Sequence, residues 1–382
     1  MASPSSAADK IPIVYSPLSL LHNPPHEILS GCVQPYFESP ERYHRILSAL
    51  LDDSSRYTAH ELEVTRDRVE TKELKEAVAR VHEEDYLVFL EEIYEEWIKE
   101  GGSKDAVLPE TFLRKDLLLE DTLPDNVKES AIARTGQFSF DLSAPITADT
   151  RIAALASAWV AISATRLLLT SDSPTATFAL CRPPGHHATP ALCGGYCYLN
   201  NLAIAVRDYQ TLSASSPGST RSKVAILDID YHHGNGTSKI FFNDPSVLYV
   251  SLHGSPDYPY YTGSISERGG PDARDLNINY PLPLGTDNEA YLETLEKGIK
   301  DISRFDPEMV FVSLGVDTFV DDPLTQFKIT MEAYPEMGKL VASLKKRTVF
   351  VMEGGYCLPA IGGCVKGVLD GFLESTAANA EY

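Results

Sequence analysis

Hydrophobic positions in the second half of the chain gather into five short runs that are rich in β-branched and aromatic residues. Strands buried on both faces of a sheet have this composition. Helical stretches such as residues 199–210 and 289–303 separate most of the runs. The pattern predicts an α/β fold with an open, mostly parallel sheet and helices on both faces. The runs are TATFAL, KVAILDID, SVLYVSL, MVFVSLGVD and TVFVMEGG, starting at residues 175, 223, 246, 309 and 348.

The first half of the chain has a weaker pattern. Residues 86–100 place apolar side chains at helical spacing, and two following glycines predict the end of that helix. A second helix is expected over residues 151–170, which are rich in Ala and Leu. Residues 103–148 lack clear periodicity and are interpreted as an inserted loop region. Residues 211–222 are expected to form a surface linker.

The ends of the chain and its hydropathy set the expected domain limits and location. Residues 1–11 are mostly small and polar and predict a disordered tail, followed by one domain over residues 12–376. The start lacks the basic and apolar regions of a secretory signal. No apolar run reaches the length of about 18 residues that a membrane span needs. We therefore expect no membrane partner and an intracellular protein, cytoplasmic or alternatively nuclear.

The net charge and the cysteine spacing argue against two classes of function, nucleic-acid binding and a structural zinc knuckle. The formal net charge is −21, which argues against a nucleic-acid partner because phosphate binding needs Lys and Arg. An acidic surface suits a cationic substrate, although it also serves solubility alone. The six cysteines form no CxxC pair, so a structural zinc knuckle is not expected and the thiols are predicted to be reduced.

Polar residues follow the predicted strands, and the most concentrated group lies in LDIDYHHGNGT at residues 227–237. Because ligands bind at the carboxyl ends of strands in open α/β sheets, the five strand ends are expected to form one site. Alternate side chains of an extended segment share a face, which would bring Asp228, Asp230 and His232 together. Buried carboxylates favour a cation, and these donors suit Zn²⁺ or alternatively Fe²⁺ or Mn²⁺. The other interpretation is a hydrogen-bonded polar cluster or a surface turn.

A third strong ligand is available in SLGVDTF, where Asp317 follows another predicted strand. An Asp at this place can also be a helix N-cap. Asp230, His232 and Asp317 together would leave one position open for water or substrate, as in catalytic zinc sites.

Two further strand ends offer groups for proton transfer and for charge stabilisation. RPPGHHA carries the pair His186 and His187, which could ligate a metal or move protons. A carboxylate or amide, such as Asp228 or Asn235, could fix the tautomer of one ring. Tyr356 follows two glycines in EGGY and could donate to a carbonyl oxygen as that oxygen gains charge, or could simply pack.

These motifs carry a resemblance to a known family. CRPPGHHA, GGYCYLNNLAIAV, AILDIDYHHGNGT, VSLHG, SLGVDTF and VMEGGY occur in this order. Together they resemble the zinc-dependent histone deacetylase superfamily, and most closely the acetylpolyamine amidohydrolases and related class II-type deacetylase-like amidohydrolases. The resemblance covers about residues 12–375. It implies an arginase-like open sheet of about eight strands and hydrolysis of N-acetyl amides of extended amines.

Carried over by motif, the resemblance assigns the catalytic roles. His187 is expected to be the general base and then the acid, oriented by Asn235. His186, paired with Asp228, is expected to act mainly through its charge. Tyr356 is expected to polarise the acetyl carbonyl together with the metal.

The resemblance also assigns two ions. The zinc ligands are expected to be Asp230, His232 and Asp317. A monovalent cation, usually potassium in the superfamily, is expected beneath the zinc site at Asp228, Asp230, His232, Ser251 and Leu252.

A narrow substrate tunnel is a further implication. Tyr196 and Tyr258 fall where the superfamily has two aromatic walls, with phenylalanine common at both, and Gly195 is expected beside them. Leu324 in DDPL occupies a gatekeeper position. Arg42 resembles an internal arginine linked to acetate exit.

Substrate choice remains open between two alternatives. The 103–148 region resembles an insertion that helps polyamine-type members dimerise, which predicts a homodimer. In the polyamine-type members, an acidic residue near the tunnel mouth meets the distal ammonium of the substrate. Thr135 occupies the position where one such acid is expected, and Leu324 at the gatekeeper position is apolar. The function expected is therefore removal of acetyl groups from acetylpolyamines or similar small acetylamines, and the alternative is an acetyl-lysine deacetylase acting on peptides. Nearby acids that could substitute are Glu120, Asp121, Asp125 and Glu129.

Overall fold

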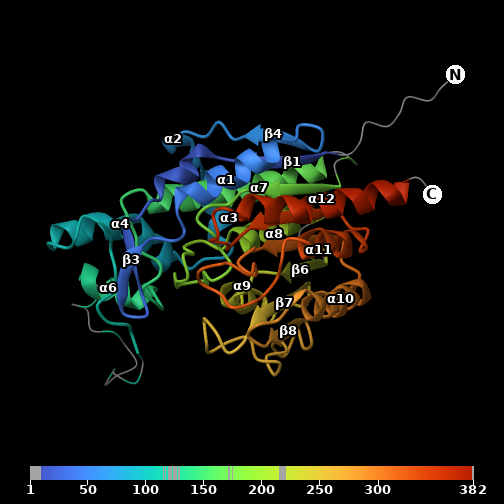
Figure 1. Cartoon of the computed structure of the whole chain (residues 1–382). Helices are drawn as coiled ribbons and strands as arrows, with labels where there is room; N and C mark the ends of the chain where they lie inside the picture. Colours follow the sequence, from blue (N-terminus) through green and yellow to red (C-terminus); the bar gives the residue numbers. More distant parts are fainter. Residues whose placement is uncertain are drawn as a thin grey trace.

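An eight-stranded sheet forms the centre of the computed structural model (Figure 1). The strand order is β4-β1-β5-β10-β9-β6-β7-β8, and every pair of neighbours is parallel. The expected α/β fold is thus confirmed. The strands are β1 (Ile11–Tyr15), β4 (Tyr57–Glu61), β5 (Ala176–Ala179), β6 (Val224–Asp228), β7 (Val247–Gly254), β8 (Asn277–Leu282), β9 (Met309–Leu314) and β10 (Thr348–Met352). The structure describes residues 10–114, 116, 118, 123, 127, 130–170, 173, 175–214 and 221–380.

The five predicted strands correspond to β5, β6, β7, β9 and β10, and three strands of the sheet were not predicted. β4 and β8 lie at the two edges, where one side of a strand is unpaired and polar residues are tolerated. Their sequences, YTAHE and NINYPL, accordingly lack a continuous apolar run. β1 contains a proline, which normally argues against a central strand. A separate antiparallel hairpin, β2 (His26–Leu29) with β3 (Cys32–Pro35), was also missed.

Helices cover both faces of the sheet. α7 and α8 pack on one face together with α3, and α1, α10, α11 and α12 cover the other. Alternate residues of β6 divide between these layers: Val224 and Ile226 join the first core, and Ala225 and Leu227 join the second. The helices are α1 (Pro40–Leu51), α2 (Arg66–Val69), α3 (Lys72–Ala79), α4 (Glu84–Lys99), α6 (Ala131–Phe138), α7 (Thr150–Leu169), α8 (Asn201–Leu212), α9 (Asn235–Phe241), α10 (Asn288–Phe305), α11 (Ala333–Ala342) and α12 (Ile361–Ala380).

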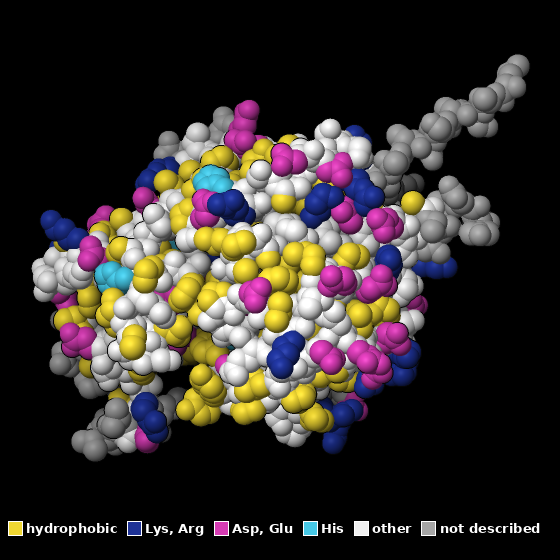
Figure 2. All heavy atoms as spheres, viewed as in Figure 1, with side chains coloured by type: hydrophobic (Ala, Val, Ile, Leu, Met, Phe, Trp, Pro, Cys, Tyr) yellow, Lys and Arg dark blue, Asp and Glu magenta, His cyan; other side chains and the backbone are white. Residues whose placement is uncertain are grey.

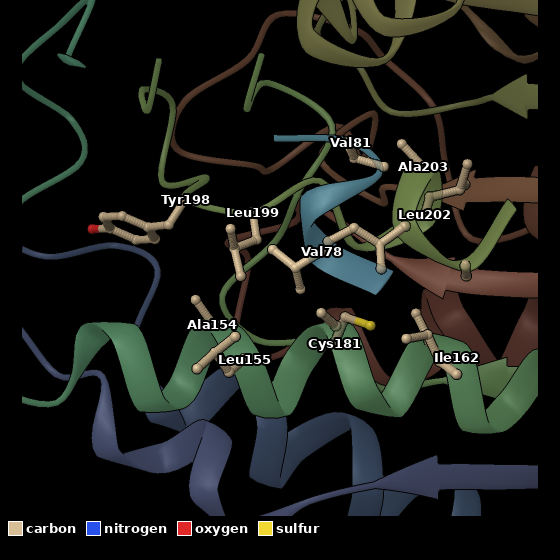
Figure 3. Packing of buried hydrophobic residues seen from close by; sticks show 14 of the residues in the cluster. Val78, Val81, Ala154, Leu155, Ile162, Cys181, Tyr198, Leu199, Leu202 and Ala203 are labelled. Atoms are coloured by element: carbon tan, nitrogen blue, oxygen red, sulfur yellow. The ribbon is translucent and has the colours of Figure 1, made fainter. Parts of the chain in front are cut away.

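α7 is the central helix of the first core. Ala154, Leu155 and Ile162 point from it towards residues of α3 and α8 (Figure 3). By length and composition it is the one helix among the described residues that could cross a membrane, yet 67% of its apolar window is buried inside the protein. Its hydrophobic composition is therefore that of a core helix.

Three expectations about the segment limits need correction. The 103–148 region contains the helix α6, and a bridge between Val107 and Ile146 joins its two ends. β1 begins at Ile11, inside the expected tail, and α12 extends to Ala380. Residues 1–9 and 215–220 lie outside the described part of the chain. All six cysteines are free, as expected.

Candidate active site

A pocket opens at the carboxyl ends of the central strands, between the β2–β3 hairpin and the loop that follows β7. Residues from both of these segments line it. Figure 2 shows a hollow on this side of the molecule, edged by hydrophobic side chains, between the region of β3 and α6 and the region of β7 and β8. The pocket wall includes His187, Gly195, Tyr196, His232, Tyr258, Leu324 and Tyr356.

Three side chains at the base of this pocket form a group that could hold a metal ion. The ligand atoms of Asp230, His232 and Asp317 all lie within 4.8 Å of one another. His232 Nδ1 is 2.9 Å from Asp317 Oδ2 and 3.3 Å from Asp230 Oδ1. Both carboxylates are fully buried, and burial of two acids this close is costly without a cation between them. The oxygen and nitrogen donors fit a divalent metal, and three protein ligands leave room for a further one.

The local backbone explains why these residues meet. β6 ends at Asp228, and the chain turns before it reaches Asp230 and His232. A β-carbon at Gly354 would lie 2.6 Å from Asp317 Oδ2 and 2.7 Å from Asp230 Oδ2, so only glycine permits the carboxylates to pack there. Asp228 lies beside Asp230, but it is not part of the group that could hold a metal.

Asp228 instead belongs with His186. Its Oδ2 lies 3.2 Å from His186 Nδ1 and accepts a hydrogen bond from the hydroxyl of Tyr249 at 2.9 Å. Burial lowers the pKa of His186, but the charges of Asp230 and Asp228 outweigh this and raise it to about 10. These two carboxylates therefore favour the protonated form of His186.

His187 is in the opposite electrostatic state. Its Nδ1 lies 2.7 Å from Asn235 Oδ1, and its ring centroid is 4.0 Å from that of His186. Burial and the charges of His186 and His232 hold the pKa of His187 well below its ordinary value. A neutral imidazole with one nitrogen fixed by an amide oxygen can accept a proton at the other nitrogen.

Tyr356 lies at the end of the glycine loop after β10. The guanidinium of Arg42 is 4.9 Å from the centroid of the Tyr356 ring. Arg42 also donates to the carbonyl oxygens of Gly355 at 2.6 Å and Glu353 at 2.5 Å, so it holds the backbone on both sides of Gly354. Asp322 accepts the backbone N–H of Tyr356 at 2.7 Å.

The two aromatic walls of the pocket are each hydrogen-bonded to a carboxylate. The hydroxyl of Tyr196 donates to Glu27 Oε2 at 2.8 Å, and that of Tyr258 donates to Asp141 Oδ2 at 2.6 Å. Gly195 has a positive φ, and a β-carbon there would lie 2.4 Å from the ring of His187. Glycine is therefore required where the two walls approach the histidine.

Thr135, the position considered for an acid near the mouth of the tunnel, does not line the pocket. That side chain is buried in α6 and donates to the carbonyl oxygen of Ala131. Glu120, Asp121, Asp125 and Glu129 lie outside the described residues. The acids that the structure brings to the pocket were missed: Asp257 lines it, and Glu27 and Asp141 lie behind its walls. Of these three acids, the sequence gave a signal only for Asp257, because it directly precedes the expected wall residue Tyr258 in DYPYY.

The residues expected at a potassium site lie next to one another. Asp228 of β6 is in register with Ser251 of β7, and Leu252 follows it. Asp228 Oδ1 accepts the backbone N–H of Asp230 at 3.3 Å. The side chain of Ser251 lies 2.9 Å from His253 Nδ1. The geometry brings these groups together, and their use for an ion stays a prediction.

Comparison with known proteins identifies the family. The model of the histone deacetylase domain matches residues 36–372. The chain belongs to the histone deacetylase family. It is 39% identical to acetylpolyamine amidohydrolase 2 of Pseudomonas aeruginosa, over 94% of this chain and 98% of that protein. The structure of an acetylpolyamine aminohydrolase from Burkholderia pseudomallei superposes with a TM-score of 0.82 at 32% identity, covering 96% of this chain and 99% of that one.

The match to a plant histone deacetylase covers less of the chain. Histone deacetylase 8 of Arabidopsis thaliana is 37% identical, but over 58% of this chain and 60% of that protein. The resemblance seen in the sequence motifs is thus confirmed at the level of family and fold. Membership in this family makes the protein a deacetylase-type hydrolase with a metal cofactor, and Asp230, His232 and Asp317 are the described group that fits a metal.

Proposed function

We propose that the protein is a zinc-dependent amidohydrolase that removes acetyl groups from acetylated polyamines or similar small acetylamines. The observation that carries this proposal is that His232, a member of the group with Asp230 and Asp317 that could hold a metal, lines the same pocket as His187 and Tyr356. Relatives that span nearly the whole chain are acetylpolyamine amidohydrolases, which favours small amines over peptides.

Zinc is the metal proposed for the three ligands, with a monovalent cation at the Asp228–Ser251 register pair. Zinc, when bound, lowers the pKa of water and polarises a carbonyl group. The donor set of two carboxylates and one imidazole, without a thiolate, supports this choice.

The side chains around the metal group supply the remaining chemistry. His187 would accept a proton from the attacking water and later return it to the departing amine, because it is neutral and its Nδ1 is fixed by Asn235. His186 would remain charged beside Asp228 and favour the negative charge that develops nearby. Tyr356 would donate its O–H to the acetyl carbonyl oxygen, since burial holds the pKa of its phenol well above the ordinary value.

An acetyl-lysine deacetylase is the second candidate, and Leu324 is the observation that favours it. This wall residue is apolar, so it offers no charge to a distal ammonium. The comparison of acetylputrescine, acetylspermidine and an acetyl-lysine peptide as substrates of the zinc-loaded enzyme decides between the two. Higher kcat/KM for the small amines supports the proposal, and higher kcat/KM for the peptide overturns it.

Two further properties are proposed with the function. A homodimer fits the resemblance of the 103–148 region to a dimerising insertion, and light scattering would test it. An intracellular location fits the six free cysteines.

A further inference from the structure

The hydroxyl of Tyr258 is hydrogen-bonded away from the metal group. It donates to Asp141 Oδ2 at 2.6 Å, and the same oxygen accepts the backbone N–H of Gly195 at 2.9 Å. The Tyr258 ring stands edge-on to His187, with centroids 5.0 Å apart and an interplanar angle of 87°. One side chain thus joins the loop after α6 to the wall of the pocket.

Tyr196 repeats this arrangement on the other wall. Its hydroxyl donates to Glu27 Oε2 at 2.8 Å, and the second oxygen of Glu27 accepts the backbone N–H of Phe37 at 3.0 Å. Glu27 is fully buried, and it belongs to the β2 strand of the hairpin. The two walls therefore obtain their carboxylates from separate segments outside the sheet.

Neither carboxylate has a cationic partner among the described residues. The ion pairs of the described part of the chain include no contact from Glu27 or Asp141 to Lys, Arg or His. Burial raises the pKa of both carboxyl groups, and the hydrogen bonds from the two phenols and from backbone N–H groups oppose this shift and favour the ionised forms. When ionised, each carboxylate is therefore a negative charge behind the pocket wall that no described Lys, Arg or His side chain pairs with.

A tyrosine hydroxyl has one proton to donate, and Tyr196 and Tyr258 each donate theirs to a carboxylate. Because each O–H points to a carboxylate, any further hydrogen bond to these oxygens must be accepted by them. A hydrogen bond to an ionised carboxylate also shifts electron density onto the phenol oxygen and strengthens it as an acceptor. Phenylalanine at either position would offer neither property.

We propose that Tyr196 and Tyr258 are specificity-determining residues whose carboxylate-bound hydroxyls accept N–H groups of a protonated amine chain. This inference rests on the proposed function and deepens it, because it explains how a pocket with an apolar Leu324 selects a cation. The walls would favour ammonium groups over a neutral aliphatic chain of equal length.

The test compares two substrates that differ only in charge. N-acetylputrescine carries a terminal ammonium, and N-pentylacetamide has a methyl group in its place. For Tyr258→Phe and Tyr196→Phe, we expect kcat/KM for N-acetylputrescine to fall about tenfold or more, as for a lost hydrogen bond to a charged group. The value for N-pentylacetamide should change by less than about twofold on the same scale. Calorimetry with 1,4-diaminobutane should show weaker binding to both variants.

Tyr57→Phe is the matched control. The hydroxyl of Tyr57 also donates to a carboxylate, that of Asp370, at 2.6 Å, but Tyr57 belongs to the edge strand β4 and does not line the pocket. This variant should leave both substrates and diamine binding unchanged. Equal losses for the two substrates, or diamine affinity that survives in both wall variants, would overturn the inference and leave the proposed function standing. If the wild-type enzyme hydrolyses only N-pentylacetamide, the proposed function fails, and the diamine calorimetry still decides the role of the phenols.

Discussion

Asp322 holds two parts of the active-site wall at once. One carboxylate oxygen accepts the backbone N–H of Tyr356 at 2.7 Å, and the other accepts that of Leu324 at 3.0 Å. The side chain of Asp322 is buried. Its geometry couples the position of Tyr356 to that of Leu324, and both of these residues line the pocket.

Replacing Asp322 should therefore reduce turnover without removing the metal. In Asp322→Ala, both N–H groups lose their acceptor and the Tyr356 loop is free to shift, and a misplacement of about 1 Å can lower the rate about 100-fold. We expect kcat to fall more than KM rises, with zinc content unchanged. Asp322→Asn keeps one acceptor and should recover part of the rate. The exposed neighbour supplies the control, Asp321→Ala, which should match the wild type.

Tyr356→Phe tests the carbonyl-polarising role that is proposed for the Tyr356 hydroxyl. The loss of one donor aimed at a developing negative charge lowers kcat about 100- to 1,000-fold in comparable enzymes. Elemental analysis should still find a full complement of zinc, because Tyr356 is not part of the group that could hold the metal. Tyr94→Phe, which removes a hydroxyl that donates to the carbonyl oxygen of Lys104, is the remote control. Turnover that survives in Tyr356→Phe would exclude this role.

The sequence predicted the metal group because its members follow apolar strands in short motifs. Asp230 and His232 are two positions apart, and Asp317 lies three positions after the end of β9. Such residues are recognised locally, since carboxylates and an imidazole at the carboxyl end of a buried strand are typical of a ligand site.

The carboxylates behind the walls could not be predicted in this way. Tyr196 and Glu27 are 169 positions apart, and Tyr258 and Asp141 are 117 apart. Glu27 lies in a short hairpin and Asp141 in a loop, where a single acid has no periodic context. The edge strands β4 and β8 were missed for a related reason, because a half-solvated strand lacks the continuous apolar run that marks a buried one.

Removal of a metal ligand should lower metal content. After dialysis, His232→Ala and Asp317→Asn should each retain well under one zinc per chain, and activity should not return when zinc is added at stoichiometric amounts. Asparagine at 317 preserves an acceptor for the backbone N–H of Tyr231, which Asp317 receives at 2.8 Å, so folding is protected. His60→Ala, on the exposed part of β4, should bind zinc normally. Full zinc occupancy in the ligand variants would refute the assignment.

Asn235→Asp should move the pH profile in a defined direction. The neutral amide oxygen of Asn235 faces His187 Nδ1, and a carboxylate there would favour the imidazolium and raise the pKa of His187. Because the unprotonated ring is the one that accepts a proton, a higher pKa moves the acidic limb of kcat/KM to higher pH. Asn243→Asp, at an exposed position, should leave the limb in place. If the acidic limb stays fixed or moves to lower pH in Asn235→Asp, then His187 is not the group whose titration produces that limb.

Two ion pairs at the start of α1 have the same i,i+4 spacing but differ in burial. Glu38 and Arg42 are buried and 2.6 Å apart, whereas Glu41 and Arg45 are 2.7 Å apart with 45% and 59% of their side chains exposed. Glu38 also lies 3.0 Å from the buried guanidinium of Arg182, so Glu38→Ala leaves two buried cations without their shared carboxylate. We expect this variant to lose about 3–5 kcal/mol in the free energy of unfolding, and Glu41→Ala to lose at most about 1 kcal/mol. Urea denaturation of the two variants measures both values. Similar losses would mean that burial does not govern the cost of breaking this pair, and Arg42 would then not depend on Glu38 to hold the backbone beside Tyr356.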